Sequence, residues 1–378
     1  MAKGGAVDGD HVTWPAELHT LAKHRVYKQY LSKWMPIMIN SWKGDVTYAE
    51  GFAGPGVYTA GEPGSPVIAL RVLVGDPSLR MRARDLRFLF VEKDRNRAER
   101  LREELAKAVR PVQLNELGRY GIDMVVESGD YDPTLTDLLS AHNAWGRPML
   151  VVLDTFGGSV KLDLVRRIAA NPSSEVIITF QPQHFIRFAK ADRVQHGDTV
   201  FGDPDWRRVD EQPQADKAQW VVDKYRAVLQ EAGFHFVLTF ELVSADGRSL
   251  FLVFGTTHVR GLQKMKEAMW EVDPISGVQY RDPADPDQQL LDIELEPQTE
   301  PLRRELLNYL RSQPDCTASV SSLRRYALYN TVYKESQVKP ELDKLVEKGI
   351  AAGDGGDGRV RLGGNVHLID STAGTGGS

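Results

Sequence analysis

The feature that most constrains the fold is the stretch from Val46 to Gly56, which reads Val-Thr-Tyr-Ala-Glu-Gly-Phe-Ala-Gly-Pro-Gly. Its β-branched and aromatic residues predict a short strand with Glu50 at its tip, followed by a glycine-rich turn into a helix. Glycines are needed where a backbone turns tightly and approaches a ligand, and a helix N-terminus favours polar or anionic groups. The stretch therefore predicts a nucleotide-like ligand site at the carboxyl edge of a parallel sheet, with an ordinary strand-end acid as the alternative for Glu50.

A second half of such a site follows at the expected distance. The apolar run Phe88–Val91 ends in Glu92, and a helical pattern covers 95–109. In doubly wound folds that bind nucleosides, an acid at the tip of the second strand accepts hydrogen bonds from the ribose hydroxyls. This region has no G-x-G-x-x-G or G-x-x-x-x-G-K-[ST] phosphate motif. An acid placed before Phe-Ala-Gly-x-Gly is instead typical of S-adenosylmethionine (SAM) sites, where it can lie near the amino-acid part of the cofactor.

A third strand, 122–127, ends just before Asp130. This acid is well placed to read the adenine amino group of a bound nucleoside, and it is equally an N-cap for the helix 133–141. We therefore predict SAM as the cofactor. The predicted cofactor-binding residues are Glu50, Phe52, Ala53, Gly54, Gly56, Glu92, Lys93, Asp130 and Tyr131.

The run Pro148–Leu153 predicts a central parallel strand buried on both faces, and it ends in Asp154, Thr155 and Phe156. The acid–x–aromatic order is similar to the [DN]-P-P-[FYW] tetrapeptide of amino-group methyltransferases, although Thr155 stands in the place of a proline. There the polar residue helps to hold the target nitrogen and the aromatic ring stacks on the acceptor. We predict Asp154 and Phe156 as the catalytic residues, with Asp154 as the base or orienting group.

Two further segments supply candidate substrate contacts. The helical stretch 14–39, interrupted at Pro36, places His19 and Lys23 on one face by their i,i+4 spacing. That face is either solvated or closes over the cofactor or substrate. The polar segment 181–214 is expected to be an irregular substrate-binding insertion carrying His184 and Arg187. Its histidines show no metal-ligand spacing, so no metal is predicted.

The order of elements predicts the fold class. After the fourth strand come a helix at 162–170, a strand at 175–180, a helix at 219–232 and a hairpin formed by 234–243 and 249–256. Five alternating strand–helix units closed by a hairpin predict an α/β, doubly wound, Rossmann-like SAM-methyltransferase fold. Its sheet is mostly parallel and its last strand is antiparallel. This domain is assigned to 11–272.

The C-terminal part predicts a second domain. Residues 273–300 are rich in Pro and Asp and are assigned as a linker. Helices at 302–310, 320–326 and 336–348, with a hairpin of 350–352 and 359–362, predict a winged helix-turn-helix at 301–364. A disordered tail is expected at 365–378. The residues predicted to contact nucleic-acid phosphates are Tyr333, Lys334, Lys339, Lys344 and Arg359. Protein contacts are the alternative, because Asp354 and Asp357 in the wing would repel phosphate.

Composition excludes several classes. The chain of 378 residues is long enough for two or three domains, and its net charge of -5 excludes a polycation built for indiscriminate nucleic-acid binding. Cys316 is the single cysteine, so neither an internal disulfide nor a multi-cysteine metal site can form within the chain. No apolar run approaches the about 18 residues that a membrane span needs. A cytoplasmic protein is expected, and its oligomeric state is left open.

With these motifs together, the chain resembles the three-Cys-motif partner protein family, from about Trp14 to the predicted winged helix. The matching motifs are Leu18-His19-Thr20-x-x-Lys23-His24, Tyr30-Leu31-x-x-Trp34, Tyr48 to Gly56 with Gly64-Ser65-Pro66, Leu153 to Gly157, and Gly255-Thr256-Thr257-His258 with Met265 and Trp270. Family members usually show Asp-Pro-Phe-Gly where this chain has Asp154-Thr155-Phe156-Gly157. The resemblance implies a SAM-methyltransferase-like fold and a partner similar to radical-SAM proteins.

The leading hypothesis is a SAM-dependent methyltransferase that transfers a methyl group to nitrogen or oxygen, with the winged helix recruiting a nucleic acid or a protein. A second hypothesis is a non-catalytic SAM-binding partner of a radical-SAM-like protein. A third is a winged-helix nucleic-acid-binding regulator whose methyltransferase-like domain no longer binds SAM.

Overall fold

The computed structural model describes residues 12–78, 85–110, 113–155, 160–189, 195–244, 246–281 and 297–369. The chain forms two compact units, which are described separately. The first comprises Met1–Lys264 and Gln279–Leu291, and the second comprises Met265–Val278 and Asp292–Ser378. No helix in the described ranges combines the length and the apolar character required to cross a bilayer.

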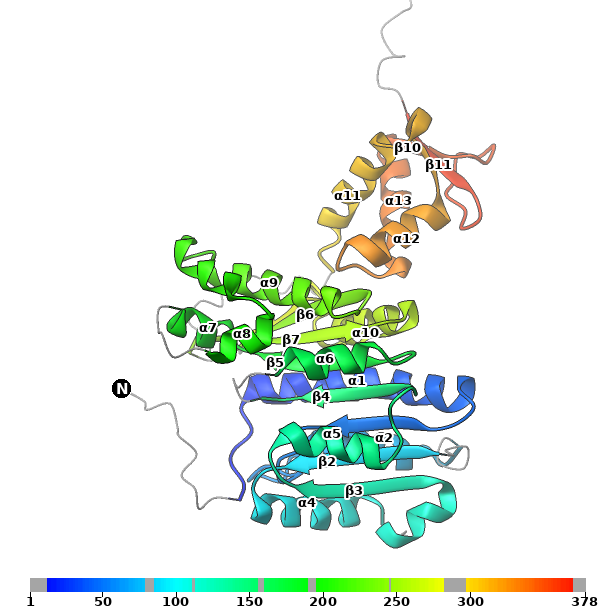
Figure 1. Ribbon diagram of the computed structural model, residues 1–378. Helices are drawn as coiled ribbons and strands as arrows, with labels where there is room; N and C mark the ends of the chain where they lie inside the picture. Colours follow the sequence, from blue (N-terminus) through cyan, green and yellow to red (C-terminus); the bar gives the residue numbers. More distant parts are fainter. Residues whose placement is uncertain are drawn as a thin grey trace, which may run out of the picture. The chain divides into compact units, whose positions relative to one another are not determined.

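The first unit is built on an eight-stranded sheet, within the described residues, of order β3-β2-β1-β4-β5-β7-β6-β8 (Figure 1). Its strands are β1 (Val46–Glu50), β2 (Leu86–Glu92), β3 (Ile122–Ser128), β4 (Met149–Leu153), β5 (Glu175–Phe180), β6 (Phe236–Val243), β7 (Ser249–Thr256) and β8 (Gln279–Arg281). The pairs from β3 to β5 are all parallel. The expected α/β class with a mostly parallel, Rossmann-like sheet is confirmed.

The hairpin of β6 and β7 closes the sheet. Strand β7 lies between β5 and β6 and is antiparallel to both, so the last strand of the hairpin is inserted into the sheet as the sequence predicted. Beyond it, β8 pairs parallel with β6 through Glu241 and Gln279. The linker assigned to 273–300 is therefore wrong at this point, because the backbone of Gln279–Arg281 pairs with β6 as an edge strand.

Helices cover both faces of the sheet. They are α1 (Leu18–Ser41), α2 (Ser65–Val74), α4 (Arg95–Ala108), α5 (Tyr131–Ala141), α6 (Leu162–Ala169) and α9 (Lys217–Glu231), with a 3-10 helix η1 (Leu114–Tyr120). Helix α10 (Val259–Val272) begins in the first unit and continues into the second from Met265. In Figure 1, α5 and α6 lie in front of the sheet and α1 lies behind it. The predicted interruption at Pro36 is wrong, because buried Trp34, Met35 and Met38 on either side keep α1 packed through the proline.

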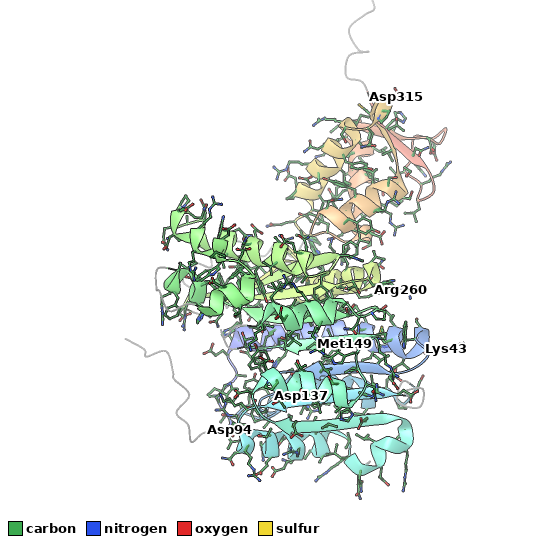
Figure 2. All side chains as sticks on the ribbon, in the orientation of Figure 1. Lys43, Asp94, Asp137, Met149, Arg260 and Asp315 are labelled. Carbon is green, nitrogen blue, oxygen red and sulfur yellow. The ribbon has the colours of Figure 1, made fainter. Side chains whose placement is uncertain are left out.

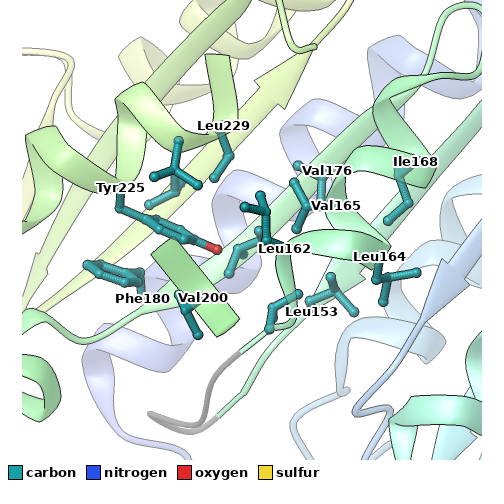
Figure 3. Close-up of a cluster of buried hydrophobic side chains, with 14 of the residues drawn as sticks. Leu153, Leu162, Leu164, Val165, Ile168, Val176, Phe180, Val200, Tyr225 and Leu229 are labelled. Atoms are coloured by element: carbon teal, nitrogen blue, oxygen red, sulfur yellow. The ribbon is translucent and has the colours of Figure 1, made fainter. Parts of the chain in front are cut away.

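The front face of the sheet carries a continuous apolar core. Leu153 of β4, Val165 of α6 and Phe180 of β5 belong to one buried cluster with Tyr225 and Leu229 of α9 (Figure 3). The rings of Phe180 and Tyr225 stack at 4.3 Å between centroids. Burial of such side chains contributes about 1.5–3 kcal/mol each, so this cluster fixes the sheet on which the strand tips are presented.

The segment 181–214 was expected to be irregular, and that prediction is wrong. It contains α7 (Pro182–Phe188), α8 (Gln195–Phe201) and the 3-10 helix η2 (Pro204–Glu211). Phe185, Phe201 and Trp206 pack on one another with centroid distances of 5.0–5.9 Å. These aromatic side chains join the core cluster, and their burial stabilises helices too short to show a clear period in the sequence.

The two ends of the sheet are marked by labelled residues in Figure 2. Asp94, directly after β2, lies at the carboxyl end of the parallel strands. Lys43, before β1, lies at the opposite, amino end. The two ends are called here the carboxyl edge and the amino edge.

The second unit contains three longer helices and a small sheet. They are α11 (Glu300–Arg311), α12 (Val320–Asn330) and α13 (Val338–Glu347), and the strands are β9 (Thr317–Ser319), β10 (Ala351–Gly353) and β11 (Asn365–Leu368), with short 3-10 turns η3 (Pro314–Cys316) and η4 (Glu335–Gln337). The described sheet is antiparallel, of order β10-β11-β9.

Two boundaries predicted for this unit are wrong. The partner of β10 is 365–368 rather than 359–362, and the disordered tail cannot begin at Asn365, because that residue starts the central strand β11. Val366 is fully buried whereas Leu362 is 56% exposed, so burial selects the later segment. The Asp354 carboxylate also accepts a hydrogen bond from the Asn365 backbone at 2.9 Å, which fixes this register. The rest of the expected tail, 370–378, lies outside the described residues.

A buried lysine closes the end of α12. Lys266 Nζ donates to the carbonyl oxygens of Leu328 and Thr331 at 2.6 Å, and to those of Ala327 and Tyr333 at 3.2 Å. The last carbonyls of a helix have no partner within the helix, so this ammonium satisfies groups that would otherwise be orphaned. Burial lowers the pKa of Lys266 to about 7, and Glu335 opposes that shift.

Candidate functional site

Four loops that follow parallel strands meet at the carboxyl edge of the first unit. The sheet order β3-β2-β1-β4 places Asp130, Glu92, Glu50 and Asp154 at or just beyond four successive strand tips. The chain leaves β1 toward β2 on one side and later returns to form β4 on the other. Such a reversal of strand order leaves a crevice at the carboxyl ends of the strands, where open α/β sheets bind ligands.

The glycine loop after β1 is held open by its backbone. Gly54 has φ of 64°, a conformation that favours glycine, and its N–H donates to Glu92 Oε2 at 2.8 Å. The nearest described atom to a Cβ built at Gly54 is Trp14 Cη2, at 3.9 Å. A Cβ at position 54 would therefore be in ordinary van der Waals contact with the Trp14 indole, which lies close over the loop. Gly56 differs, because a Cβ there would lie 2.7 Å from Leu101 Cδ1, so helix packing requires that glycine.

Glu92 joins the tip of β2 to this loop. Its Oε1 accepts from the Asp94 backbone at 2.9 Å and its Oε2 accepts from Gly54, while the residue is 8% exposed. Each carboxylate oxygen has two lone pairs, so both retain capacity for a further donor. Two backbone bonds fix the carboxylate in position, and the remaining lone pairs suit a pair of hydroxyl donors.

Other predicted cofactor residues lie beside this loop. The rings of Phe52 and Tyr131 pack at 4.8 Å between centroids, and the Ala53 backbone N–H donates to Val91. Lys93 pairs with Asp130 at 2.8 Å, and both side chains are more than half exposed. Asp130 occupies the N-cap position of α5, but its side chain makes no capping bond.

Glu50 lies beneath the loop. Its carboxyl accepts hydrogen bonds from Tyr48 Oη and Ser65 Oγ, both at 2.6 Å, and the residue is 0% exposed. Burial raises the pKa of Glu50 to about 8 despite the two hydrogen bonds that oppose the shift. The protonated acid therefore predominates at neutral pH. It ties the tip of β1 to the start of α2, at the two ends of the glycine loop.

Asp154 forms a buried ion pair with Lys23. The two charged atoms are in direct contact, and the side chains are 10% and 4% exposed. Burial by itself would raise the pKa of Asp154, but the Lys23 ammonium outweighs it and holds that pKa below its usual range. Asp154 is therefore a charged group that can accept a hydrogen bond but takes up a proton poorly at neutral pH.

Three polar atoms near this pair have no hydrogen-bond partner among the described residues. They are His24 Nδ1 and Tyr27 Oη on α1, and Thr179 Oγ1 on β5. All three residues are at least nine-tenths buried. Burial, followed by the Lys23 charge, lowers the pKa of His24 to about 3, so its imidazole is neutral. Buried polar atoms are nearly always bonded. The Thr179 hydroxyl lies close enough to interact with the Tyr27 hydroxyl and the Asp154 carboxylate, so His24 Nδ1 is the atom that points most clearly to a ligand or to water.

The sequence reasoning missed Tyr27, Thr179 and Trp14 as site residues. Trp14 packs edge-on against Tyr58 at 5.9 Å, and the Arg97 guanidinium lies 4.9 Å from its ring centroid. Tyr27 lies one turn after Lys23 on the same helix face, which is the signal that would have found it.

The remaining candidates occupy separate places. His19 lies on the first turn of α1, with Nδ1 3.2 Å from a Glu17 carboxylate oxygen. His184 and Arg187 lie on α7, directly beyond β5, and both contact Phe188. Phe156, the second predicted catalytic residue, lies outside the described residues. Within the described ranges no group of three or more His, Cys, Asp or Glu side chains is arranged to hold a metal ion.

Comparison with known proteins gives matches to solved structures alone. No protein-family model matches the chain, and no curated protein does. An O-methyltransferase from Bacillus cereus in complex with SAH is 14% identical with a TM-score of 0.31, covering 61% of this chain and 80% of that chain. The O-methyltransferase TomG from Streptomyces achromogenes, involved in tomaymycin synthesis and in complex with SAM, is 14% identical with a TM-score of 0.32, covering 61% and 79%. At these values the matches carry no residue roles to this chain.

Proposed function

We propose that the first unit is a SAM-dependent methyltransferase whose cofactor lies across the tips of β1, β2 and β3. The observation that carries this proposal is the Glu92 carboxylate, fixed by two backbone N–H groups beside a glycine loop with positive φ at Gly54. Glu92 would accept the two ribose hydroxyls. Phe52, Ala53, Gly54 and Tyr131 would form the walls, with Gly56 allowing the loop to pack on α4, and Asp130 with Lys93 would border the adenine.

The buried polar atoms beside Asp154 suit the amino-acid end of the cofactor and the acceptor. Tyr27 is a donor, because burial keeps the pKa of its hydroxyl well above the usual value. Neutral His24 can accept or donate through Nδ1, according to its tautomer, and the Thr179 hydroxyl can do either. Glu50 would act from below, by holding the loop rather than by touching the cofactor.

When bound, SAM supplies an electrophilic methyl group, whose C–S bond breaks with its electron pair passing to sulfur. The acceptor nitrogen or oxygen forms the new bond to that methyl carbon. Asp154, kept charged by Lys23, would orient the acceptor by accepting a hydrogen bond from its N–H or O–H. Methylation makes the acceptor atom acidic, and its proton then passes to solvent. Orientation is the main contribution asked of the protein.

Calorimetric titration with SAM and S-adenosylhomocysteine tests the cofactor site. Hydrogen bonds to charged groups contribute about 1.5–3 kcal/mol, so Glu92→Gln should weaken binding by roughly 10- to 100-fold. The matched control is Glu99→Gln, an exposed acid on α4 that pairs with Arg95, and its affinity should equal that of the parent. Absence of binding to the folded parent would refute the cofactor assignment, and unchanged affinity in Glu92→Gln would refute the role of Glu92.

A non-catalytic SAM-binding protein is the second candidate, and the Lys23–Asp154 pair favours it. A carboxylate whose pKa is held low by a buried lysine is a weak general base. This candidate predicts that the protein binds SAM but releases no S-adenosylhomocysteine. The assay offers amine, hydroxyl and peptide acceptors, with SAM as the sole methyl source. Detection of labelled methyl product with any acceptor would refute it.

For the second unit we propose a winged-helix module that recruits a protein, with the radical-SAM-like partner implied by the family resemblance as the occupant. Three of the five residues expected to contact phosphates are engaged internally. Lys339 pairs with Asp343 and Lys344 with Glu341, both at 2.7 Å, and the Tyr333 hydroxyl donates to the Gln298 carbonyl.

Fluorescence anisotropy with labelled duplex DNA and RNA at two salt concentrations separates this proposal from nucleic-acid recruitment. We expect weak binding whose affinity changes little with salt, because few phosphates would be neutralised. Submicromolar binding that falls as salt rises, and that is lost in Lys339→Gln, would overturn the protein-recruitment assignment.

A further inference from the structure

A cavity of about 210 Å³ opens at the amino edge of the first unit, away from the proposed cofactor site. Its walls come from the second half of α1, through Tyr30 and Trp34, and from Trp42 directly after the helix, and its floor includes Glu175 at the start of β5. The lining also includes Arg260 from the first turn of α10. Figure 2 shows Arg260 and Lys43 at the same end of the molecule, opposite to Asp94.

The cavity cannot serve the methyl-transfer reaction directly. Strand β5 runs from Glu175 to Phe180, and a strand rises about 3.3 Å per residue, so the two edges are roughly 17 Å apart. Reacting atoms must approach to about 3–3.5 Å. A molecule in this cavity is therefore not the acceptor of a methyl group carried at the carboxyl edge.

The walls select a planar apolar ring. Trp34 and Tyr30 are at least 97% buried, and Trp42 is 37% exposed at the mouth. Large aromatic side chains bind flat rings by stacking and edge contacts. The volume is below the roughly 300 Å³ at which pockets for drug-sized ligands begin, so one small ring system fits inside and a larger substituent has to extend through the open mouth.

The indole N–H of Trp34 requires an acceptor. Trp34 Nε1 is buried and has no hydrogen-bond partner within the described ranges, although it belongs to a residue lining the cavity. An indole nitrogen is a donor only, and a buried donor left unpaired is costly. An acceptor atom on a bound ring would satisfy it.

The mouth carries positive charge. Arg260 lines the cavity and supplies this charge, and its exposed side chain is drawn on the surface. The acid on the floor does not cancel this charge, because Glu175 is 4% exposed and already accepts from the Tyr30 and Thr256 hydroxyls. Burial also raises the pKa of Glu175 to about 7. Position 261 must be glycine for this arrangement, since a Cβ there would lie 2.2 Å from Glu175 Oε1.

We infer that this cavity is a second ligand site, which binds a small planar ring carrying a hydrogen-bond acceptor and an anionic group. The ring lies between the Trp34 and Trp42 side chains, its acceptor bonds Trp34 Nε1, and its anionic group lies at Arg260. A nucleoside monophosphate and an aromatic carboxylate share this chemistry, and the experiment distinguishes them. The site is independent of the proposed methyltransferase activity.

Isothermal titration of the full chain with 5′-AMP, 5′-GMP, indole-3-carboxylate and benzoate tests the inference. Each titration is run with and without S-adenosylhomocysteine at about 1 mM, the upper end of the usual range of KM values. We expect either the nucleotides or the aromatic carboxylates to bind, with the same affinity in the presence and absence of S-adenosylhomocysteine. Displacement of the probe by S-adenosylhomocysteine would place the probe at the carboxyl edge and would overturn the inference. Absence of binding by all four probes would overturn it as well.

Two variants locate the bound probe. Trp34→Phe keeps a ring but removes the N–H, and it should weaken binding about 3- to 10-fold, the range expected for one hydrogen bond. Arg260→Gln should weaken binding by about 10-fold or more, because it removes a charge-assisted contact. The controls are Trp145→Phe and Arg95→Gln, which lie outside the cavity lining, and neither should change the affinity. Equal affinity of the parent and both cavity variants overturns the inference.

Circular dichroism melting of each variant establishes that it is folded. If Trp34→Phe fails to fold, Arg260→Gln still decides the outcome, because its exposed side chain is not part of the core. These results do not depend on whether SAM binds, so failure of the proposed function and failure of this second site are distinguishable.

Discussion

Breaking the Lys23–Asp154 pair should reduce the stability of the first unit strongly. The perturbation is a double-mutant cycle with Lys23→Met, Asp154→Asn and the combined variant. Lys23 lies on α1 and Asp154 follows β4, 131 positions later in the chain, and both side chains are at least nine-tenths buried. The pair therefore joins a covering helix to the centre of the sheet.

The burial sets the magnitude. Removal of one partner leaves an uncompensated buried charge, which costs about 3–5 kcal/mol, whereas exposed pairs contribute about 0–1 kcal/mol. Each single variant should therefore lose roughly 3 kcal/mol or more at pH 7. The combined variant, which buries no charge at this place, should lose less than the sum of the two by about 2 kcal/mol. Because the folded-state pKa of Asp154 is lowered, its contribution is present above the ordinary pKa of 3.8 and is lost as the pH falls through the lowered value.

Urea denaturation at pH 7 measures these free energies of unfolding. Hydrogen-exchange mass spectrometry of peptides from α1 and β4 assigns the transition to the first unit. The matched control is the exposed Asp163–Arg166 pair on α6, whose disruption by Arg166→Met should cost less than 1 kcal/mol. Additive losses in the cycle, or a loss below 1 kcal/mol in both single variants, would refute the reasoning from burial.

Three further predictions concern other buried groups. Because the pKa of Glu50 is raised from 4.5 to about 8, its contribution to stability is complete below pH 4.5 and is lost as the pH rises through 8. The urea midpoint of the parent should therefore fall between pH 6 and 9, and Glu50→Gln should reduce that fall. An equal fall in the parent and in Glu50→Gln would contradict this. Lys266→Met leaves four carbonyl oxygens without their ammonium and should destabilise the second unit by about 3 kcal/mol in calorimetric melting, with a loss under 1 kcal/mol as the contrary result. Trp206→Ala removes a fully buried ring and should cost about 3–5 kcal/mol, seen as faster hydrogen exchange in α7 and α8; unchanged exchange there would show that the aromatic cluster does not hold these helices.

The elements predicted correctly are those whose conformation is determined by their own local residues. The bounds of β5 and β7 were predicted correctly, because unbroken apolar and aromatic runs of this length form strands buried on both faces. The position of the glycine loop followed from Gly54, whose positive φ few other residues adopt. The antiparallel pairing of β6 and β7 followed from the two strand-like runs, 234–243 and 249–256, joined by a short connection.

The rest depended on contacts between distant parts of the chain. Helices α7 and α8 have seven residues each, too few to show a helical period, and Trp206 on η2 supplies the packing that stabilises them. The strand at Asn365 was missed because Val366 becomes buried against residues far earlier in the chain. The pairing of Asp154 with Lys23 has no local signature at all, since 131 positions separate the two residues.

The insertion of β7 has a consequence for the protein as it is being made. Strand β5 can acquire its outer neighbour only when Thr256 has been synthesised, 81 residues after its partner Glu175. At roughly 5–20 residues per second, that delay is about 4–16 s. During this delay, one edge of the apolar strand β5 has unpaired backbone N–H and C=O groups. Such an exposed edge can pair with strands of other chains and so promote aggregation. Slower translation between these two positions should therefore increase aggregation of newly made chains without altering the mature molecule.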